Sequence, residues 1–289
     1  MSVLDSIKAI LRDPPPEFAF EISASGIAMS RTRPPATLQY AALPEGAVVP
    51  SPVKDNVHDA VALADAVRKL IPAGSGRGRR TATLILPDNA MRLAVIDFAT
   101  LPDKEEERLA LIKFRLRKTL PFDIDEAAFS CHVQAGNKVL AAIAPVEVVA
   151  RYEAPFRAAG VHPGFITAAS LAMLELMPAK GSVLIAHLAP GALTVLALED
   201  GVITLIRTLE LSGPDEISAD IYPTLVYIED HFGHRPDKLL LAGFGDDAQS
   251  AATRLSIELE IETQPVSAAN PGLTGYLQSL SKNTQKAAA

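Results

Sequence analysis

The sequence predicts an α/β protein of two related lobes, with a small α/β subdomain inserted into the first. Two observations support this prediction. A hairpin expected at residues 18–32 and a meander expected at residues 183–211 open two half-chains in a similar way, and helices and strands follow each. Between them, a charged helix at residues 103–120 has strand-like segments on both sides, as in a β-β-α-β-β unit. The 289 residues leave room for roughly two domains.

The first lobe is expected over residues 17–80 and 160–180. Residues 1–16 precede it as an amphipathic helix (residues 1–12) and a stiff linker, Pro14-Pro15-Pro16. Residues 74–80 form a basic, glycine-rich loop that lacks the Gly-Lys-Ser/Thr ending of a phosphate-binding loop. The elements expected in this lobe are strands at Phe18–Ser23, Ile27–Thr32, Leu38–Ala42 and Gly164–Ala168, and helices at Asp55–Ile71 and Ser170–Met177.

Residues 81–159 are expected to form the inserted β-β-α-β-β subdomain. Asp103 and Glu106 have the spacing of a capping box, and Pro121 ends the helix that they begin. One face of this helix is apolar, through Leu109, Ile112, Leu116 and Leu120. Strands are expected at Thr81–Leu86, Arg92–Phe98, Ala128–Gln134 and Lys138–Ala144, with a closing helix at Pro145–Ala159.

The second lobe is expected over residues 181–280. Its meander contains Asp200-Gly201, which is typical of a tight hairpin. Residues 281–289 have little to bury and are expected to form a disordered tail. The elements expected in the lobe are strands at Val183–Ala189, Leu193–Leu198, Val202–Leu211, Lys238–Ala242 and Ile257–Thr263, and helices at Glu216–His231, Asp246–Leu255 and Gly272–Leu280.

Composition excludes several functions. The chain carries 27 basic and 34 acidic residues, which argues against general nucleic-acid binding. Cys131 is the only cysteine, so an internal disulfide and a site with several thiolate ligands are excluded, and we expect no metal site. No apolar run approaches the roughly 20 residues of a membrane-spanning helix. Hydrolase, zinc-protease and dinucleotide-binding motifs are missing, so no catalytic residue is assigned.

A family resemblance starts from the end of the charged helix. The segment Phe-Arg-Leu-Arg-Lys-Thr-Leu-Pro-Phe at residues 114–122, followed by Asp-Ile-Asp-Glu and a strand, resembles the type IV pilus assembly family PilM. Leu-Pro-Glu-Gly-Ala-Val at residues 43–48 resembles a segment that precedes the first long helix of PilM-like chains. The resemblance covers about Glu17 to Pro271. It implies the duplicated, ribonuclease H-like fold of the actin, Hsp70 and sugar-kinase superfamily.

The resemblance also implies a nucleotide site between the lobes, built from Asp-x-Gly motifs. The aspartate helps to hold magnesium, and the glycine lets the backbone come close to phosphate. Here Glu21 and Ser23 stand where the first motif has aspartate and glycine, and His187 stands where the second has aspartate. The candidate residues of this vestigial site are Glu21, Ser23, Ser25, His187, Thr194, Gly243 and Gly245.

Two further points concern this site. His187 has the chemistry to bind phosphate or metal, but a hydrogen-bonded or surface histidine is the preferred interpretation. The helical subdomain of the second lobe is reduced or absent, because only Ser212–Asp237 separate the meander from the next strand. These departures together argue against ATP turnover. We therefore expect no cofactor, and keep ATP with magnesium as the alternative.

The function that the resemblance implies is a cytoplasmic scaffold, peripheral to the inner membrane, that works with other pilus assembly proteins. It would bind the N-terminal peptide of a PilN-like membrane protein in a groove near the inserted subdomain. Candidate groove residues are Leu116, Leu120, Pro121 and Phe122, which are equally interpretable as core of the subdomain. The alternatives are an actin-like ATP-binding protein or ATPase, and a cytoplasmic module related to the type II secretion protein GspL. GspL-like chains continue into a membrane span, which is not expected here.

Overall fold

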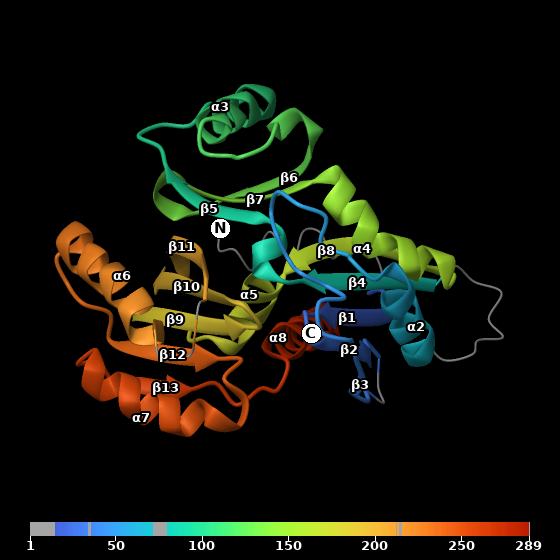
Figure 1. Cartoon of the computed structure of the whole chain (residues 1–289). Helices are drawn as coiled ribbons and strands as arrows, with labels where there is room; N and C mark the ends of the chain where they lie inside the picture. Colours follow the sequence, from blue (N-terminus) through green and yellow to red (C-terminus); the bar gives the residue numbers. More distant parts are fainter. Residues whose placement is uncertain (1–14, 34–35, 72–79, 212, 214–215, 289) are drawn as a thin grey trace.

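The computed structural model describes residues 15–33, 36–71, 80–211, 213 and 216–288, with side chains placed as far as Lys282. The helix expected at residues 1–12 and nearly all of the loop expected at residues 74–80 lie outside the described ranges. The described chain forms two five-stranded sheets and one three-stranded sheet (Figure 1). Within these ranges, no helix has the length and apolar character that a membrane crossing needs.

The two large sheets share one topology, which confirms the predicted two-lobed fold. The first consists of β1 (Phe18–Ile22), β2 (Gly26–Arg31), β3 (Gln39–Ala42), β4 (Arg80–Leu86) and β8 (Val161–Ala168), in the order β3-β2-β1-β4-β8. The second consists of β9 (Ser182–Ala189), β10 (Ala192–Glu199), β11 (Val202–Glu210), β12 (Lys238–Ala242) and β13 (Thr263–Pro265), in the order β11-β10-β9-β12-β13. In each sheet an antiparallel meander leads into two parallel strands.

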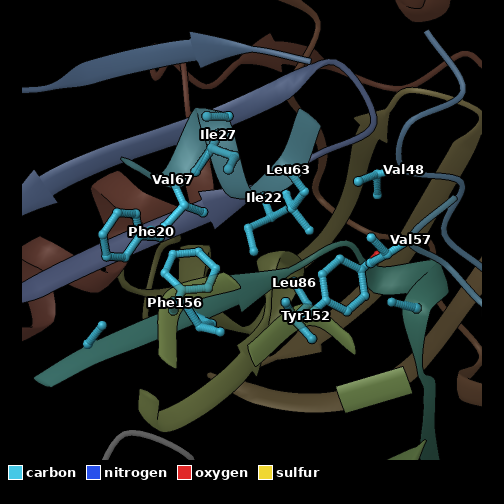
Figure 2. Packing of buried hydrophobic residues seen from close by; sticks show 14 of the residues in the cluster. Phe20, Ile22, Ile27, Val48, Val57, Leu63, Val67, Leu86, Tyr152 and Phe156 are labelled. Carbon is cyan, nitrogen blue, oxygen red and sulfur yellow. The ribbon is translucent and has the colours of Figure 1, made fainter. Parts of the chain in front are cut away.

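The first sheet has helices on both faces. On one face, α2 (Ala60–Leu70) and α4 (Val146–Ala158) bury a cluster in which the rings of Phe20 and Phe156 meet edge to face, 4.8 Å apart (Figure 2). Asp59 caps α2 by accepting hydrogen bonds from two backbone amides, so the helix begins later than the expected Asp55. Burying each large apolar side chain contributes about 1.5–3 kcal/mol, and this cluster holds the lobe together.

The last helix, α8 (Pro271–Ala288), covers the other face of the first sheet, beside α5 (Ala169–Ala172). Tyr276 of α8 hydrogen bonds through its hydroxyl to Thr83 of β4, at 2.7 Å. This helix was expected within the second lobe and instead returns to the first. The disordered tail expected from residue 281 is also wrong, because α8 continues to Ala288 and Lys282 pairs with Glu175 at 2.6 Å.

The inserted subdomain has three strands and not the predicted four. Its sheet consists of β5 (Arg92–Asp97), β7 (Lys138–Pro145) and β6 (Ala127–Val133), in that order, and α3 (Glu105–Arg117) covers one face. The strand expected at Thr81–Leu86 is β4, which pairs with β1 in the first sheet. The expected helix at Pro145–Ala159 packs as α4 in the first lobe. The predicted capping box is also wrong: Lys104 is the N-cap and makes no side-chain capping bond.

The second lobe packs α6 (Ile217–Phe232) and α7 (Ala248–Glu258) on one face of its sheet. Among the described residues, α6 is the only helix between β11 and β12, in agreement with the reduced helical subdomain. The strand expected at Ile257–Thr263 is wrong. Leu259 and Ile261 are buried against the helices, and Glu260 between them has a positive φ of 52°. The alternation of buried and exposed residues here is typical of a strand, but the strand β13 begins only at Thr263.

The other face of the second sheet packs against the inserted subdomain and the segment that begins with α5. Leu140 of β7 and Met173 belong to the same buried cluster as Ile185 and Leu196 of the second sheet. The insertion therefore rests on the second lobe as well as on the first, from which it emerges. Figure 1 shows β5 and β7 above β10 and β11.

Candidate functional site

Three buried ionisable residues meet where the two lobes touch. Glu21 lies on β1, Asp88 begins a 3₁₀ turn directly after β4, and His187 lies on β9. Their exposed fractions are 9%, 2% and 4%. Charged side chains are almost never buried to this extent unless they are paired, so this interlobe group is the candidate site of the chain.

Asp88 and His187 form a direct pair between the lobes. The Nδ1 atom of His187 lies 2.9 Å from Oδ2 of Asp88. The other carboxylate oxygen, Oδ1, accepts a hydrogen bond from the backbone amide of Ser170 at 2.9 Å. Thr194 stands opposite His187 in the β9–β10 register; its hydroxyl oxygen lies 3.2 Å from that of Thr208, and its proximity helps to lower the pKa of Asp88. Every polar contact around Asp88 thus favours its ionised form.

The two pKa values shift in opposite directions. Burial raises the pKa of Asp88, but the hydrogen bond and charge of His187, with the Ser170 amide, outweigh burial and bring this pKa below its ordinary value. Burial lowers the pKa of His187, but the Asp88 hydrogen bond and charge, with the more distant charge of Glu21, bring it above its ordinary value. Both shifts favour the charged forms of the pair, an imidazolium in the second lobe and a carboxylate in the first.

The carboxylate of Glu21 is bound to the first turn of α8. Its Oε2 atom accepts a hydrogen bond from the backbone amide of Leu273 at 2.7 Å. A Cβ atom on Gly272 would lie 3.1 Å from this carboxylate, so glycine permits the close approach. Burial raises the pKa of Glu21, and the Leu273 amide and His187 offset only part of that rise. Burial thus favours the protonated form of Glu21, whereas the Leu273 amide at the start of α8 favours its ionised form.

The serines predicted for the site lie apart from this group. Ser23 and Ser25 belong to the turn between β1 and β2, and their hydroxyl oxygens lie 3.0 Å from each other. Ser23 also exchanges hydrogen bonds with Gly26, at 3.1 Å and 3.2 Å. Ser23 is half-buried and Ser25 is exposed. Their hydroxyls stabilise the turn of which they are part.

The two glycines after β12 differ in their surroundings. Gly243 has a φ of +81°, and a Cβ atom there would lie 2.1 Å from the carbonyl oxygen of Leu188. Gly245 has a φ of +56° and open space around it. Phe244 between them is 7% exposed and packs in the core of the second lobe. Gly243 therefore lets the loop after β12 contact the backbone of β9 beside His187.

Asp88 and Ser170 are residues that sequence analysis missed. The sequence Pro87-Asp88-Asn89 was interpreted only as a turn. A usable signal was present, because Asp88 follows the buried strand Thr81–Leu86, and polar residues at the carboxyl ends of parallel strands meet at one sheet edge. Its partner His187 lies 99 residues away in the sequence, so the pair itself needed the fold.

The interlobe group does not fit a magnesium–nucleotide complex as it is arranged. Glu21 already accepts a hydrogen bond from a backbone amide in the first turn of α8. Asp88 already contacts His187 and accepts a hydrogen bond from the Ser170 amide. No set of three or more histidine, cysteine or acidic side chains placed to hold a metal ion occurs among the described residues. In this arrangement the Asp88 and His187 side chains pair with each other, and Glu21 pairs with the start of α8.

The candidate groove residues have different exposures. Leu116 is 2% exposed and belongs to the core between α3 and the small sheet. Leu120 and Phe122 are partly buried against that core, and Pro121 is exposed. Nearby on α3, Phe114 is 61% exposed. Leu116 is therefore a core residue, and the accessible part of the motif consists of Leu120, Pro121 and Phe122.

Comparison by sequence finds no matching family model and no matching curated protein. Solved structures do match. The structure titled as the PilM–PilN type IV pilus biogenesis complex aligns with a TM-score of 0.74 and 18% identity, covering 94% of this chain and 99% of that one.

Two other structures align less closely. A Bacteroides thetaiotaomicron protein of unknown function with an actin-like ATPase fold gives a TM-score of 0.56 and 13% identity, covering 90% of this chain and 94% of that one. The cytoplasmic domain of EpsL, an inner-membrane component of the type II secretion system of Vibrio cholerae, gives 0.55 and 9% identity, covering 93% and 94%. The chain therefore has the actin-like ATPase fold, in an arrangement similar to that of PilM.

Proposed function

We propose that this chain is a PilM-like cytoplasmic scaffold of a type IV pilus or a related secretion assembly, and that it acts without ATP turnover. The observation that carries the proposal is the similarity to the PilM–PilN structure over 94% of the chain. The EpsL cytoplasmic domain, from a secretion system, shares the fold. One neighbour is named for a pilus biogenesis complex and the other for an inner-membrane component of a secretion system, which favours an assembly role over metabolic catalysis.

The absence of ATP turnover is proposed from the interlobe group. ATP hydrolysis on this fold would require a divalent ion and phosphates where Glu21, Asp88 and His187 now pair with protein atoms. Displacing these contacts would leave buried charges without partners, which is costly. The alternative, an ATP-binding protein, predicts that millimolar magnesium–ATP raises the melting temperature, because a ligand bound only by the native state stabilises it.

The proposed partner is the N-terminal cytoplasmic peptide of a PilN-like single-span membrane protein. Such a peptide would bind beside the inserted subdomain, where Leu120, Pro121 and Phe122 end α3 next to the exposed Phe114. An extended peptide gains affinity by placing alternate apolar side chains on a preformed surface. The chain would then be held at the inner membrane through this partner.

Calorimetry with a synthetic peptide tests the proposal. The peptide is the N-terminal cytoplasmic segment of a PilN-like single-span membrane protein. We expect binding that a Pro121→Glu, Phe122→Ala double variant weakens at least tenfold, which is about 1.4 kcal/mol. Tyr222→Ala is the matched control, because Tyr222 is 54% exposed on α6, far from the motif in the sequence.

The outcomes separate the candidate functions. No binding of the peptide by the unaltered chain would contradict the scaffold proposal. Equal weakening by Tyr222→Ala would show that the binding surface is misplaced. A secretion module related to EpsL is the second candidate, favoured by the shared fold. It would bind the cytoplasmic components of a type II secretion system in the same calorimetric assay and not the pilus peptide.

A further inference from the structure

We infer that the side chains of this protein hold its two lobes in one fixed arrangement, replacing the bound ligand that would otherwise bridge them. This inference concerns the lobes themselves and does not depend on the peptide partner. It rests on two separate links between regions distant in the sequence. One is the buried Asp88–His187 pair, and the other is a buried glutamine of the inserted subdomain.

The first link joins the edges at which the two sheets meet. Asp88 follows β4 of the first sheet, and His187 lies on β9, the central strand of the second. The charged groups that face His187 are Asp88 and Glu21, both from the first lobe. Separating the lobes would break the 2.9 Å contact and move His187 away from both carboxylates. The geometry thus couples lobe separation to the loss of a buried ion pair.

The second link is Gln134, which follows β6 and is 4% exposed. Its Nε2 atom donates to the carbonyl oxygen of Ile203 on β11, and its Oε1 atom accepts from the amide of the same residue, both at 2.9 Å. One side chain thus makes the pair of hydrogen bonds that a neighbouring strand would make. It ties the inserted subdomain to the edge of the second sheet.

The apolar surroundings of these links oppose separation as well. Val95 and Leu140 of the inserted sheet pack in one cluster with Ile203 and Ile206 of the second sheet. Lobe separation would expose this cluster to water and would leave Gln134 and Ile203 without their hydrogen-bond partners. Glu21 contributes where α8 brings the chain back to the first lobe, because its side chain accepts a hydrogen bond from the first turn of that helix. All these contacts favour the same single arrangement.

The experiment measures the distance between spin labels on the two lobes by pulsed electron paramagnetic resonance, in the full chain. Cys131 is first replaced by serine, and labels are attached at Val61→Cys on α2 and Ile257→Cys on α7, which are 69% and 75% exposed. The labelled chain with Asp88, His187 and Gln134 intact should give one narrow distance distribution, and millimolar magnesium–ATP should not change it. His187→Ala and Gln134→Ala should each broaden it, and His187→Ala should lower the melting temperature by roughly 10 °C.

Two further variants distinguish the links from ordinary packing. Ser170→Ala removes a buried hydroxyl that lies beside Asp88 and has no hydrogen-bond partner, so its distribution should match that of the unaltered chain. Asp88→Asn with His187→Asn removes both charges and keeps a hydrogen bond, and should restore much of the narrow distribution. If His187→Ala fails to fold, Gln134→Ala still tests the inference.

Two results would overturn the inference. One is a broad distribution in the unaltered chain that narrows with magnesium–ATP. The other is an unchanged narrow distribution in folded Gln134→Ala and His187→Ala. Either result leaves the peptide-binding proposal standing, because calorimetry with the peptide reads a different surface.

Discussion

The ends of β1 and β9 occupy equivalent places in the two sheets, and one carries an acidic residue where the other carries a basic one. Glu21 lies near the end of β1 and His187 near the end of β9, and each strand is flanked by an antiparallel and a parallel neighbour. The resemblance described above places aspartate at both positions, and two facing acids would need a cation between them. Here acidic Glu21 and Asp88 of the first lobe face basic His187 of the second. This difference is the basis of our inference that a contact within the protein takes the place of a ligand in this duplicated fold.

The substitution with the largest expected effect removes His187, the basic residue of the Asp88–His187 pair. His187→Ala leaves Asp88 buried without its partner, and breaking a buried pair in this way costs about 3–5 kcal/mol of unfolding free energy. Urea denaturation followed by circular dichroism measures the loss. Ser170→Ala is the matched control at the same place, and we expect it to change stability by less than about 0.5 kcal/mol. Equal effects of the two substitutions would show that the ion pair is unimportant.

A second test compares the two glycines after β12. Both have positive φ angles, so alanine at either position costs about 1–2 kcal/mol. Only at Gly243 would the added Cβ also meet the carbonyl oxygen of Leu188, at 2.1 Å, so Gly243→Ala should cost at least about 1 kcal/mol more than Gly245→Ala. Thermal unfolding of both variants measures the difference. Identical melting temperatures would contradict the close contact beside His187.

A smaller effect on stability is expected from substitutions of Glu21, the acidic residue near the end of β1. Glu21→Gln keeps an oxygen that can accept from the Leu273 amide but removes the charge near the start of α8. Removing a charge from a helix N-terminus costs about 0.3–1 kcal/mol, and neutralising a buried carboxylate offsets part of this. We therefore expect a loss below about 1 kcal/mol in urea denaturation. Glu21→Ala, which leaves the amide without an acceptor, should cost more, by about 1–3 kcal/mol.

Much of the fold could be predicted from local patterns. The Asp200-Gly201 hairpin was recognisable because both residues adopt positive φ, at 48° and 78°. The duplicated meanders indicated two lobes, and the sheets confirm them. Local patterns could not assign β4 to a sheet, because a strand's pairing partner depends on the fold and not on its own residues. For the same reason α8, with its apolar residues, was assigned to the lobe that precedes it in the chain.

The site was less predictable than the fold. Glu21, His187 and Thr194 were found through their matching positions in two motifs, and the structure brings Glu21 and His187 together with Asp88. Asp88 was missed because turn sequences such as Pro-Asp-Asn are common, and burial distinguishes this one. Ser23 and Ser25 were included because they stand at the glycine position and at a serine position of the first motif, but their side chains form hydrogen bonds within their own turn. A match to a motif position was thus a weak guide to side-chain contacts.

The smallest expected effect is a dependence of stability on pH. The pKa of His187 lies above its ordinary 6.5 in the folded chain, so its contribution to stability is complete below pH 6.5 and is lost as the pH rises through the folded value. Asp88, whose pKa lies below its ordinary 3.8, contributes above that pH and loses its contribution as the pH falls through the folded value.

The pair therefore stabilises the fold most between about pH 4 and 6.5, from the directions of these two shifts. Unfolding free energies measured by urea denaturation from pH 5 to 9 should fall with rising pH, by at most about 1.4 kcal/mol per pH unit for one proton. Glu21, whose pKa is raised above 4.5, acts in the same direction at the acidic end of this range. His187→Asn keeps a hydrogen-bond donor for Asp88 without a titrating group, so its profile should be flatter above pH 6.5. A slope that survives this substitution would assign the pH dependence to other groups and would leave His187 neutral, contrary to an ion pair between the lobes.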